Sequence, residues 1–194
     1  IQTFTSDGTF VRKWGSWGTA NRKFKQPYGV AVASDSSVYV AEWGGNRIQK
    51  FTSDGTFVRK WGSSGTADGK FKKPIDVAVA PDGSVYVADW ENQRIQKFDS
   101  AGGFLLKWGM RYKPTGVAVA PDGRGYVSCK TCNSIQKFDS AGGFLLEWGE
   151  LGHGDGQFNQ PYGVAVAPDG SVYVTYWKRT RIQKFDSAGG FVIK

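Results

Sequence analysis

The chain alternates short runs of apolar residues with turns rich in glycine, aspartate and serine. In one stretch the runs are 76–80, 85–89, 94–98 and 104–108, with PDG and DSAGG among the segments between them. Val, Ile, Phe, Tyr and Trp at alternate positions are typical of β-strands. Gly accepts positive φ and Asp caps its own turn, so both suit tight hairpins. No stretch has helical periodicity.

This four-run unit returns along the chain. The dipeptide Ile-Gln occurs at residues 1, 48, 95, 135 and 182, in steps of 47, 47, 40 and 47 residues. The short step reflects a deletion, because residues 62–80 correspond to 109–120, which are seven residues fewer. A four-stranded meander repeated at this spacing predicts the blades of a β-propeller. Near-constant units argue against separate hairpins or a β-helix. The strands of each blade are labelled a to d, from the innermost outward.

The expected fold is therefore all-β, a single propeller domain over residues 1–194 built from four-stranded antiparallel blades. The chain enters at strand c, so residues 1–15 are expected to form a c–d half blade. Full blades are expected at 27–62, 74–109, 114–149 and 161–194, the third preceded by a shortened loop. Since the last blade already has its own strands c and d, the ring is expected to be an open portion of a larger one or to be completed by another chain.

Two further expectations follow from this half blade. The first residue is Ile within a repeat, so the sequence is expected to be a segment of a longer protein. Unpaired blade faces and edges invite association, so self-association, or completion by missing blades, is predicted.

Composition and charge add two constraints. Hydrophobic residues make up 40% of the chain, enough for a packed core, and no apolar run approaches the ~20 residues of a membrane-spanning helix. The net charge of +8 is uneven, because residues 1–75 hold twelve Lys/Arg against five Asp/Glu while 76–194 hold thirteen against twelve. A basic sector can attract polyanions, acidic proteins or anionic surfaces, or serve solubility alone. Nothing in the sequence indicates a compartment.

Comparison of the copies identifies pairs at the b–c turn. Strand b ends in Glu42, Asp89, Cys129 and Tyr176, and five residues later stand Arg47, Arg94, Ser134 and Arg181. We interpret Glu42 with Arg47, and Asp89 with Arg94, as structural pairs that close the hairpin. The fourth blade leaves Arg181 without an acid at the matching position, which makes it a candidate ligand contact.

A larger set of candidates follows from the geometry of a meander, which places the b–c turns and the d–a loops on one face of the ring. This face is predicted to carry Trp43, Trp90 and Trp177, the loop tyrosines Tyr28 and Tyr162, and the basic residues Arg22, Lys23, Lys25, Lys70, Lys72, Lys73, Arg111 and Lys113. Trp, Tyr and Arg are common anchors for protein partners. Basic and aromatic side chains together also suit single-stranded nucleic acid, through phosphate charge and base stacking. In the alternative interpretation, the Trp rings cover the blade tops and the lysines are solvated.

The unit PYGVAVAPDGSVYVTYWKRTRIQKFDSAGGFV (161–192) resembles the NHL repeat, and the similarity covers nearly the whole chain. Its marks are F-x-x-P-x-G-V-A-V, D-G-x-V-Y-V, RIQKFD and G-x-F. The family's Asn-His-Leu triplet falls at the start of strand c, where this chain never keeps the His and reads Asn46-Arg47-Ile48 in its first copy. The resemblance implies a propeller that commonly has six blades, of which roughly a quarter would be missing. It also implies RNA binding on this face, as in some members of the family.

The remaining candidate chemistry is sparse. CKTC (129–132) could be a redox pair, half a metal site or a small disulfide, but a β-turn without a helix N-terminus favours exposed or half-buried thiols. Some related propellers are lyases with clustered His and a metal, whereas this chain has one His, His153. No nucleophile elbow, phosphate loop or carboxylate pair is present. No catalytic residue, metal ligand or cofactor is therefore predicted.

The expected function is a non-catalytic scaffold that binds a protein partner through the face of the b–c turns and d–a loops. The alternative is single-stranded RNA or another polyanion, held by the basic loops and the Trp rings. A lyase-like enzyme is the distant third possibility.

Overall fold

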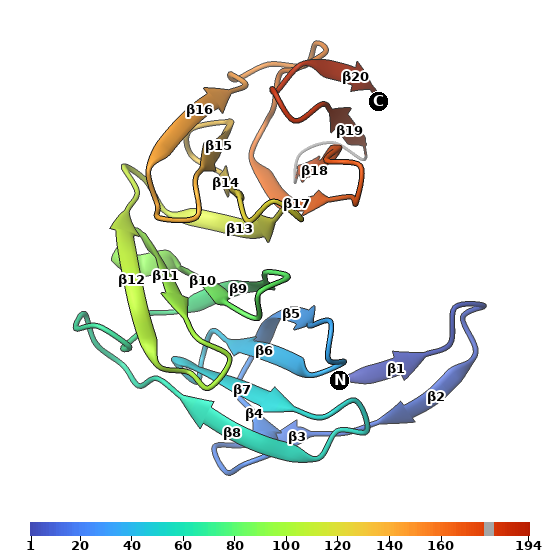
Figure 1. Ribbon diagram of the computed structural model, residues 1–194, viewed down its shortest axis with the longest axis vertical. Helices are drawn as coiled ribbons and strands as arrows, with labels where there is room; N and C mark the ends of the chain where they lie inside the picture. The colour runs from blue at the N-terminus through green and yellow to red at the C-terminus, as the bar shows by residue number, and fades with distance from the viewer. Residues whose placement is uncertain (177–180) are drawn as a thin grey trace.

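The computed structural model describes residues 1–176 and 181–194 and contains four four-stranded antiparallel sheets set around a common axis (Figure 1). The expectation of an all-β propeller is confirmed. The first full blade comprises β5 (Pro27–Val32), β6 (Val38–Glu42), β7 (Arg47–Phe51) and β8 (Phe57–Trp61). The second comprises β9 (Pro74–Val79), β10 (Val85–Asp89), β11 (Arg94–Phe98) and β12 (Phe104–Gly109).

The other two blades repeat this order. The third comprises β13 (Pro114–Val119), β14 (Gly125–Cys129), β15 (Ser134–Phe138) and β16 (Phe144–Trp148). The fourth comprises β17 (Pro161–Val166), β18 (Val172–Tyr176), β19 (Ile182–Phe185) and β20 (Phe191–Ile193). At the N-terminus, β1 (Gln2–Phe4) and β2 (Phe10–Lys13) form a two-stranded hairpin, in the place predicted for the c–d half blade.

Two short elements lie in the face of the b–c turns and d–a loops. In the first d–a loop, β3 (Ser16–Trp17) pairs in parallel with β4 (Lys23–Phe24), because the loop doubles back on itself. Single parallel bridges at Ser64–Phe71 and Leu151–Phe158 repeat this return in two later loops. The b–c turn of the second blade includes the 3-10 helix η1 (Trp90–Asn92).

The inner strands β5, β9, β13 and β17 lie side by side around the axis (Figure 1). They approach so closely that a Cβ atom on Gly29 would lie 2.6 Å from the Cα atom of Asp76. A side chain at Gly29 would therefore push the first two blades apart, which explains the glycine after the loop tyrosine.

The half blade and the first three full blades each contribute a Trp, at the end of strand d, to the following blade. Trp61 packs against Phe98 with ring centroids 5.9 Å apart and covers Gly102, where a Cβ atom would lie 2.7 Å from the indole. Gly102 has φ of +81°, so the tight c–d turn and the close approach both require glycine. The same contact recurs for Trp14, Trp108 and Trp148, so one rule joins every successive pair of blades.

Within residues 1–176 and 181–194, no helix is long and apolar enough to cross a membrane.

Candidate functional site

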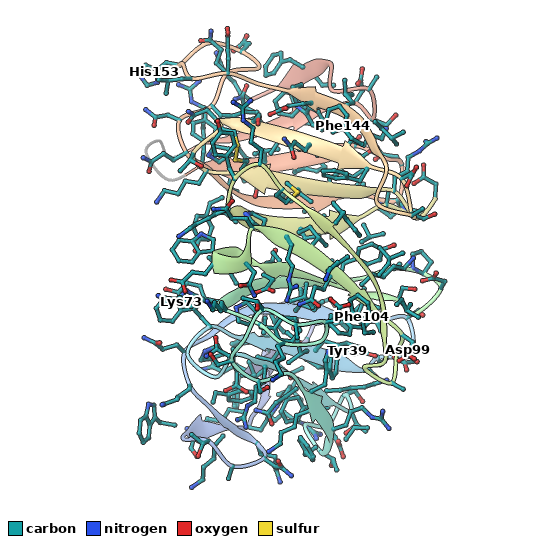
Figure 2. The ribbon with its side chains drawn as sticks, turned by 90° about the vertical axis from the view of Figure 1, so that its left-hand side faces the viewer. Tyr39, Lys73, Asp99, Phe104, Phe144 and His153 are labelled. Atoms are coloured by element: carbon teal, nitrogen blue, oxygen red, sulfur yellow. A yellow bond between two sulfur atoms is a disulfide. The ribbon has the colours of Figure 1, made fainter. Side chains whose placement is uncertain are left out.

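The b–c turns and d–a loops do share one face of the ring. Lys73 and His153, which belong to d–a loops, lie along one side of the molecule in Figure 2, and Asp99 of a c–d turn lies on the opposite side. Backbone hydrogen bonds join the loops to the turns on this face, as from Trp43 N to Gln26 O at 3.0 Å. The face of the b–c turns and d–a loops is called the loop face below.

A buried ionic network positions the long d–a loop of the second blade. Arg94 Nε donates to Asp89 Oδ2 at 2.7 Å. Its Nη1 and Nη2 atoms donate to the carbonyl oxygens of Thr66, Ala67 and Lys70 at 2.7, 3.0 and 2.7 Å. Both side chains are buried. One guanidinium therefore holds the strand pair and three carbonyls of the loop together.

The first blade contains the same network. Arg47 Nε donates to Glu42 Oε1 at 2.7 Å, and its Nη2 atom donates to Lys23 O at 2.8 Å. The second oxygen, Glu42 Oε2, accepts the backbone N–H of Lys25 at 2.8 Å. Gln49 Nε2 adds a bond to Glu42 Oε1 at 2.7 Å. The Glu42–Arg47 and Asp89–Arg94 pairs thus do more than close a hairpin, because they also fix the backbone of the basic loops.

The third blade lacks this network because it lacks the long loop that the network holds. Its d–a connection is the shortened one, and Ser134 Oγ donates to Glu147 Oε1 in place of the Arg contact. The interpretation of CKTC as two thiols is wrong, since Cys129 and Cys132 form a disulfide with Cα atoms 5.3 Å apart. In the second blade, Asn92 Nδ2 donates to Asp89 Oδ2 at 2.8 Å from the same two positions, so the b–c turn brings the side chains at these positions together.

The disulfide is expected to stabilise this turn by about 2 kcal/mol, because it closes a very short loop. The double variant Cys129→Ser/Cys132→Ser should lower the free energy of urea unfolding by that amount and leave the other turns protected from amide exchange. Titration of the denatured, unreduced protein should find no free thiol. Two free thiols would contradict the assignment.

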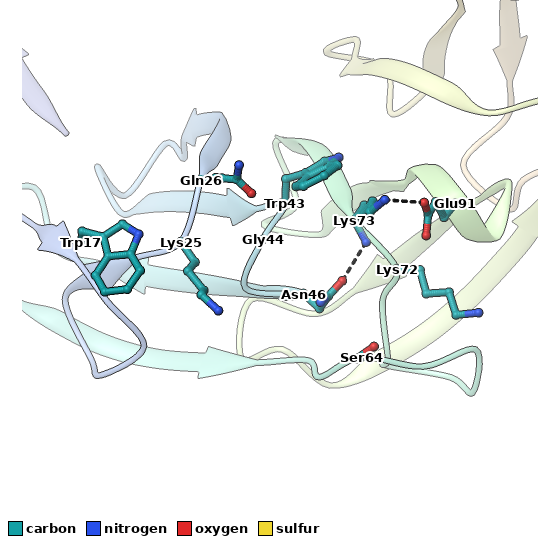
Figure 3. A pocket seen from close by; sticks show the side chains of 10 residues that line it. All are labelled: Trp17, Lys25, Gln26, Trp43, Gly44, Asn46, Ser64, Lys72, Lys73 and Glu91. Atoms are coloured by element: carbon teal, nitrogen blue, oxygen red, sulfur yellow. Dashed lines mark hydrogen bonds and ion pairs between the residues drawn. The ribbon is translucent and has the colours of Figure 1, made fainter.

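An open cleft of about 470 Å³ lies on the loop face between the first and second blades (Figure 3). It is lined by Trp17, Lys25, Gln26, Trp43, Gly44, Asn46, Ser64, Lys72, Lys73 and Glu91. Lys73 Nζ pairs with Glu91 Oε1 at 2.6 Å, and this bond, with the nearby charges of Lys73, Lys113 and Lys72, lowers the pKa of Glu91. Among the described residues, no carboxylate forms an ion pair with Lys25 or Lys72. The cleft therefore presents two uncompensated ammonium groups.

Cations and aromatic rings alternate along the inner rim of this cleft. The rings of Tyr28 and Trp43 lie 6.2 Å apart. Lys73 Nζ lies 4.6 Å from the Trp43 ring and 5.8 Å from the Trp90 ring, and Lys113 Nζ lies 4.0 Å from the Trp90 ring. Both Trp side chains are half-buried and pack against a core cluster. The lysines therefore cover part of the ring surface that stacking on a base would use.

The other predicted residues lie outside the cleft. Arg22, Lys23, Lys70 and Arg111 are exposed on the loops, and Tyr162 is half-buried, with burial the main cause of its raised pKa. The Arg181 guanidinium lies 6.0 Å from the centre of the Tyr176 ring. Trp177 lies outside the described residues.

Sequence reasoning missed Trp17, which lines the cleft with 77% of its surface exposed. A comparison of copies could have found it, because the equivalent residues in the other long d–a loops are Ser64 and Leu151. Trp17 lies in a polar loop that also contains Gly15 and Gly18. Because another copy has Ser at the same position, the fold does not require an aromatic ring there. Leu151 is also exposed, at 66%.

A second unexpected feature is Asp76, which stands on an inner strand where the three other blades have glycine. Its carboxylate accepts the backbone N–H groups of Val77 and, from the next blade, Val117, both at 2.9 Å. The residue as a whole is half-buried. Desolvation raises the pKa of the carboxyl group to about 6, and this effect is larger than that of the two hydrogen bonds, which lower the pKa. This carboxylate links the second blade to the third.

No group of three or more His, Cys, Asp or Glu side chains that could hold a metal ion occurs within the part of the chain that the structure describes.

Comparison with known proteins places these features in context. Residues 71–98, which contain most of the second blade, match the NHL repeat family model. A search of curated proteins finds no match. Similar solved structures include virginiamycin B lyase from Staphylococcus aureus, with a TM-score of 0.73 and 17% identity over 98% of this chain and 61% of that one.

Two other similar structures are a hydrazine synthase and a set of WD40 repeats. Hydrazine synthase from Kuenenia stuttgartiensis has a TM-score of 0.70 and 16% identity over 90% of this chain and 50% of that one. The RRP9 WD40 repeats have a TM-score of 0.71 and 11% identity over 87% and 51%. The chain thus spans 50–61% of the lengths of these three proteins, and at such identities the likeness establishes the fold alone.

Proposed function

We propose that the chain, a β-propeller in which residues 71–98 match the NHL repeat, is a non-catalytic scaffold that binds a protein partner through the cleft on its loop face. The observation that carries this proposal is the exposed ring of Trp17 beside the unpaired ammonium groups of Lys25 and Lys72. A Trp ring on a rigid, hydrogen-bonded loop is a strong anchor for a protein partner. The lysines favour a partner segment that carries carboxylates next to an apolar side chain.

The rigidity of the cleft supports this proposal. The loops that carry Lys25 and Lys72 are held by the buried acid–Arg networks, through Glu42 Oε2 and Asp89 Oδ1 at 2.8 and 2.7 Å. The backbone at Lys25 and Lys72 is therefore already ordered before a partner binds, which reduces the conformational entropy lost on binding.

Trp17→Ala is expected to weaken the affinity for a peptide partner by at least about tenfold, which is the loss typical of an anchor residue. Peptides would be selected from a random displayed library against the unmodified protein and then titrated by calorimetry. Leu151→Ala is the matched control, because it removes an exposed side chain at the equivalent position of another loop. Failure to select any peptide, or equal affinities for the Trp17→Ala and unmodified proteins, would contradict the proposal.

Single-stranded RNA is the second candidate, favoured by the alternation of lysines and aromatic rings along the rim. Oligouridine would serve as the probe, in fluorescence titrations from 50 to 200 mM salt. We expect no binding of oligouridine at the lowest salt concentration, because Lys73 and Lys113 already lie over the Trp rings on which the bases would stack. Binding that falls by orders of magnitude over this range, and is weakened further by Lys72→Glu, would make RNA the ligand instead.

A further inference from the structure

A glutamine near the start of strand c binds the backbone of the d–a loop in three of the four blades. In the second blade, Gln96 Oε1 accepts the N–H of Gly69 at 3.0 Å, and Gln96 Nε2 donates to Lys70 O at 2.8 Å. Gln49 and Gln183 make the same two bonds to successive residues of their own loops. All three side chains are fully buried. Each carboxamide thus binds one N–H and the next C=O of a peptide.

The equivalent Gln136 of the third blade has no long loop to bind, because the connection before this blade is the shortened one. Its side chain is half-buried and forms no hydrogen bond with any other residue that the structure describes. Met110 of the short connection packs in the core cluster that contains Phe138. In the second blade, Phe71 of the long loop packs against Phe98, with ring centroids 5.6 Å apart. The deletion therefore leaves the core filled and a polar amide uncovered.

The chain's own loops also form an ion pair beside this glutamine. On strand d of the second blade, Lys107 lies directly opposite Gln96 and pairs with Asp68 of the loop. Lys194 and Asp155 form the same pair in the fourth blade. The acidic loop residue immediately precedes the residue whose N–H the glutamine accepts.

The third blade reverses the sign of this charge. Its residue opposite Gln136 on strand d is Glu147, which is exposed. Glu147 accepts a hydrogen bond from Ser134 Oγ and has no ion-pair partner within the part of the chain that the structure describes. A segment bound here would therefore need a basic side chain where the chain's own loops have Asp.

The backbone of the loops adds a third requirement. Gly69 and Gly156, which follow the acidic residues, have φ of +74° and +79°. Glycine adopts this conformation without strain. A segment that reproduces the contact therefore has a basic residue followed by glycine.

We propose that the third blade binds a turn of a partner protein in which Lys or Arg is followed by Gly and one further residue. Gln136 Oε1 accepts the N–H of the glycine, and Gln136 Nε2 donates to the carbonyl oxygen of the next residue. The basic side chain pairs with Glu147. This site is separate from the cleft between the first two blades, and the inference does not depend on the function proposed for that cleft.

The chain itself supplies a matched pair of probes. One is the synthetic peptide of residues 63–72, which contains Asp68 and Gly69, and the other is the same peptide with Asp68→Lys. Each would be titrated into the 194-residue protein, with binding followed by the NMR signal of the Gln136 side-chain amide. The Asp68→Lys peptide is expected to bind at least about fivefold more tightly, since an attractive exposed pair replaces a repulsive one.

Three variants of the protein make the test specific. Glu147→Lys should reverse the preference between the two peptides. Asp169→Lys, in an exposed a–b turn, makes the same change in net charge and should retain the original preference. Gln136→Ala should abolish the binding of the Asp68→Lys peptide, followed by backbone amide signals, and leave the midpoint of thermal unfolding unchanged.

Two results would overturn the proposal. One is the absence of any shift of the Gln136 signal with the Asp68→Lys peptide at millimolar concentration. The other is an unchanged preference in a folded Glu147→Lys protein, since the peptide would then bind elsewhere on the surface.

Discussion

Replacing Arg94 by alanine is expected to lower the free energy of unfolding by about 3–5 kcal/mol, the range for breaking a buried ion pair. The loss exceeds that of a surface pair because Asp89 stays buried without its partner and three loop carbonyls lose their donor. Urea unfolding followed by Trp fluorescence measures the change. Arg94→Lys should recover little, since an ammonium cannot reproduce the fork of the guanidinium.

Arg181→Ala is the matched control within the same protein. Arg181 stands at the equivalent position of the fourth blade, where Tyr176 replaces the acid. Its removal is expected to lower stability by less than about 1 kcal/mol, as for a single cation–π contact. Equal losses for the two variants would show that the acid and the loop carbonyls contribute nothing to the effect at Arg94.

Loss of the Arg94 network is also expected to weaken partner binding at the cleft. The network fixes the backbone of the loop that carries Lys72, through the bond from Lys72 N to Asp89 Oδ1 at 2.7 Å. Stability and partner binding are therefore expected to decline together in Arg94→Ala, whereas Trp17→Ala should affect binding alone, because Trp17 is exposed.

Asp76 is expected to make stability fall as pH rises from about 4 to about 6. The pKa of its carboxylate is raised from 3.8 to about 6 in the folded protein, chiefly by desolvation, so folding favours the protonated form. Between these two values the folded state binds more protons than the unfolded state, and the stabilisation present at low pH is lost as the group ionises. The whole difference corresponds to about 3 kcal/mol, most of which is lost between pH 4 and pH 7.

Unfolding in urea over this pH range, compared with Asp76→Asn, isolates the effect. Other acids act in the opposite direction; the pKa of Asp54, for example, is lowered to about 2, first by its hydrogen bond from Thr52, so its stabilisation is lost only in acid. Since these groups are common to both proteins, they cancel in the difference. The Asn variant should gain stability relative to the unmodified protein as pH rises. Parallel pH curves for the two proteins would refute the role assigned to Asp76.

These two sites show how one blade differs from another without a change of fold. The acid–Arg network occurs in the two blades that flank the cleft. In the third blade, where the d–a loop is short, a disulfide occupies the two positions that form the acid–Asn contact in the second blade. The loop face is therefore ordered by different chemistry around the ring, and only the basic side between the first two blades combines ordered loops with an exposed Trp and unpaired lysines among the described residues.

The sequence by itself determined the repeated architecture of this protein. Apolar alternation, PDG and DSAGG turns and the recurring Ile-Gln steps each reflect local backbone geometry, so they predict four-stranded blades and an N-terminal hairpin without any tertiary contact. They also predict which turns share a face, because antiparallel strands alternate in direction. The pairing of Glu42 with Arg47 was readable for the same reason, since the two residues face each other across one turn.

Only the tertiary structure decided the remaining features, because they depend on atoms brought together from distant parts of the chain. The guanidinium of Arg94 binds loop carbonyls 24 to 28 residues away, and Asp76 binds a backbone N–H 41 residues away. The prominence of Trp17 and the partial covering of Trp43 by Lys73 likewise depend on how neighbouring loops fold back over the blades. Repeats specify each blade locally, whereas the site arises from the few residues that differ between copies, and their effects are set by the neighbours that packing provides.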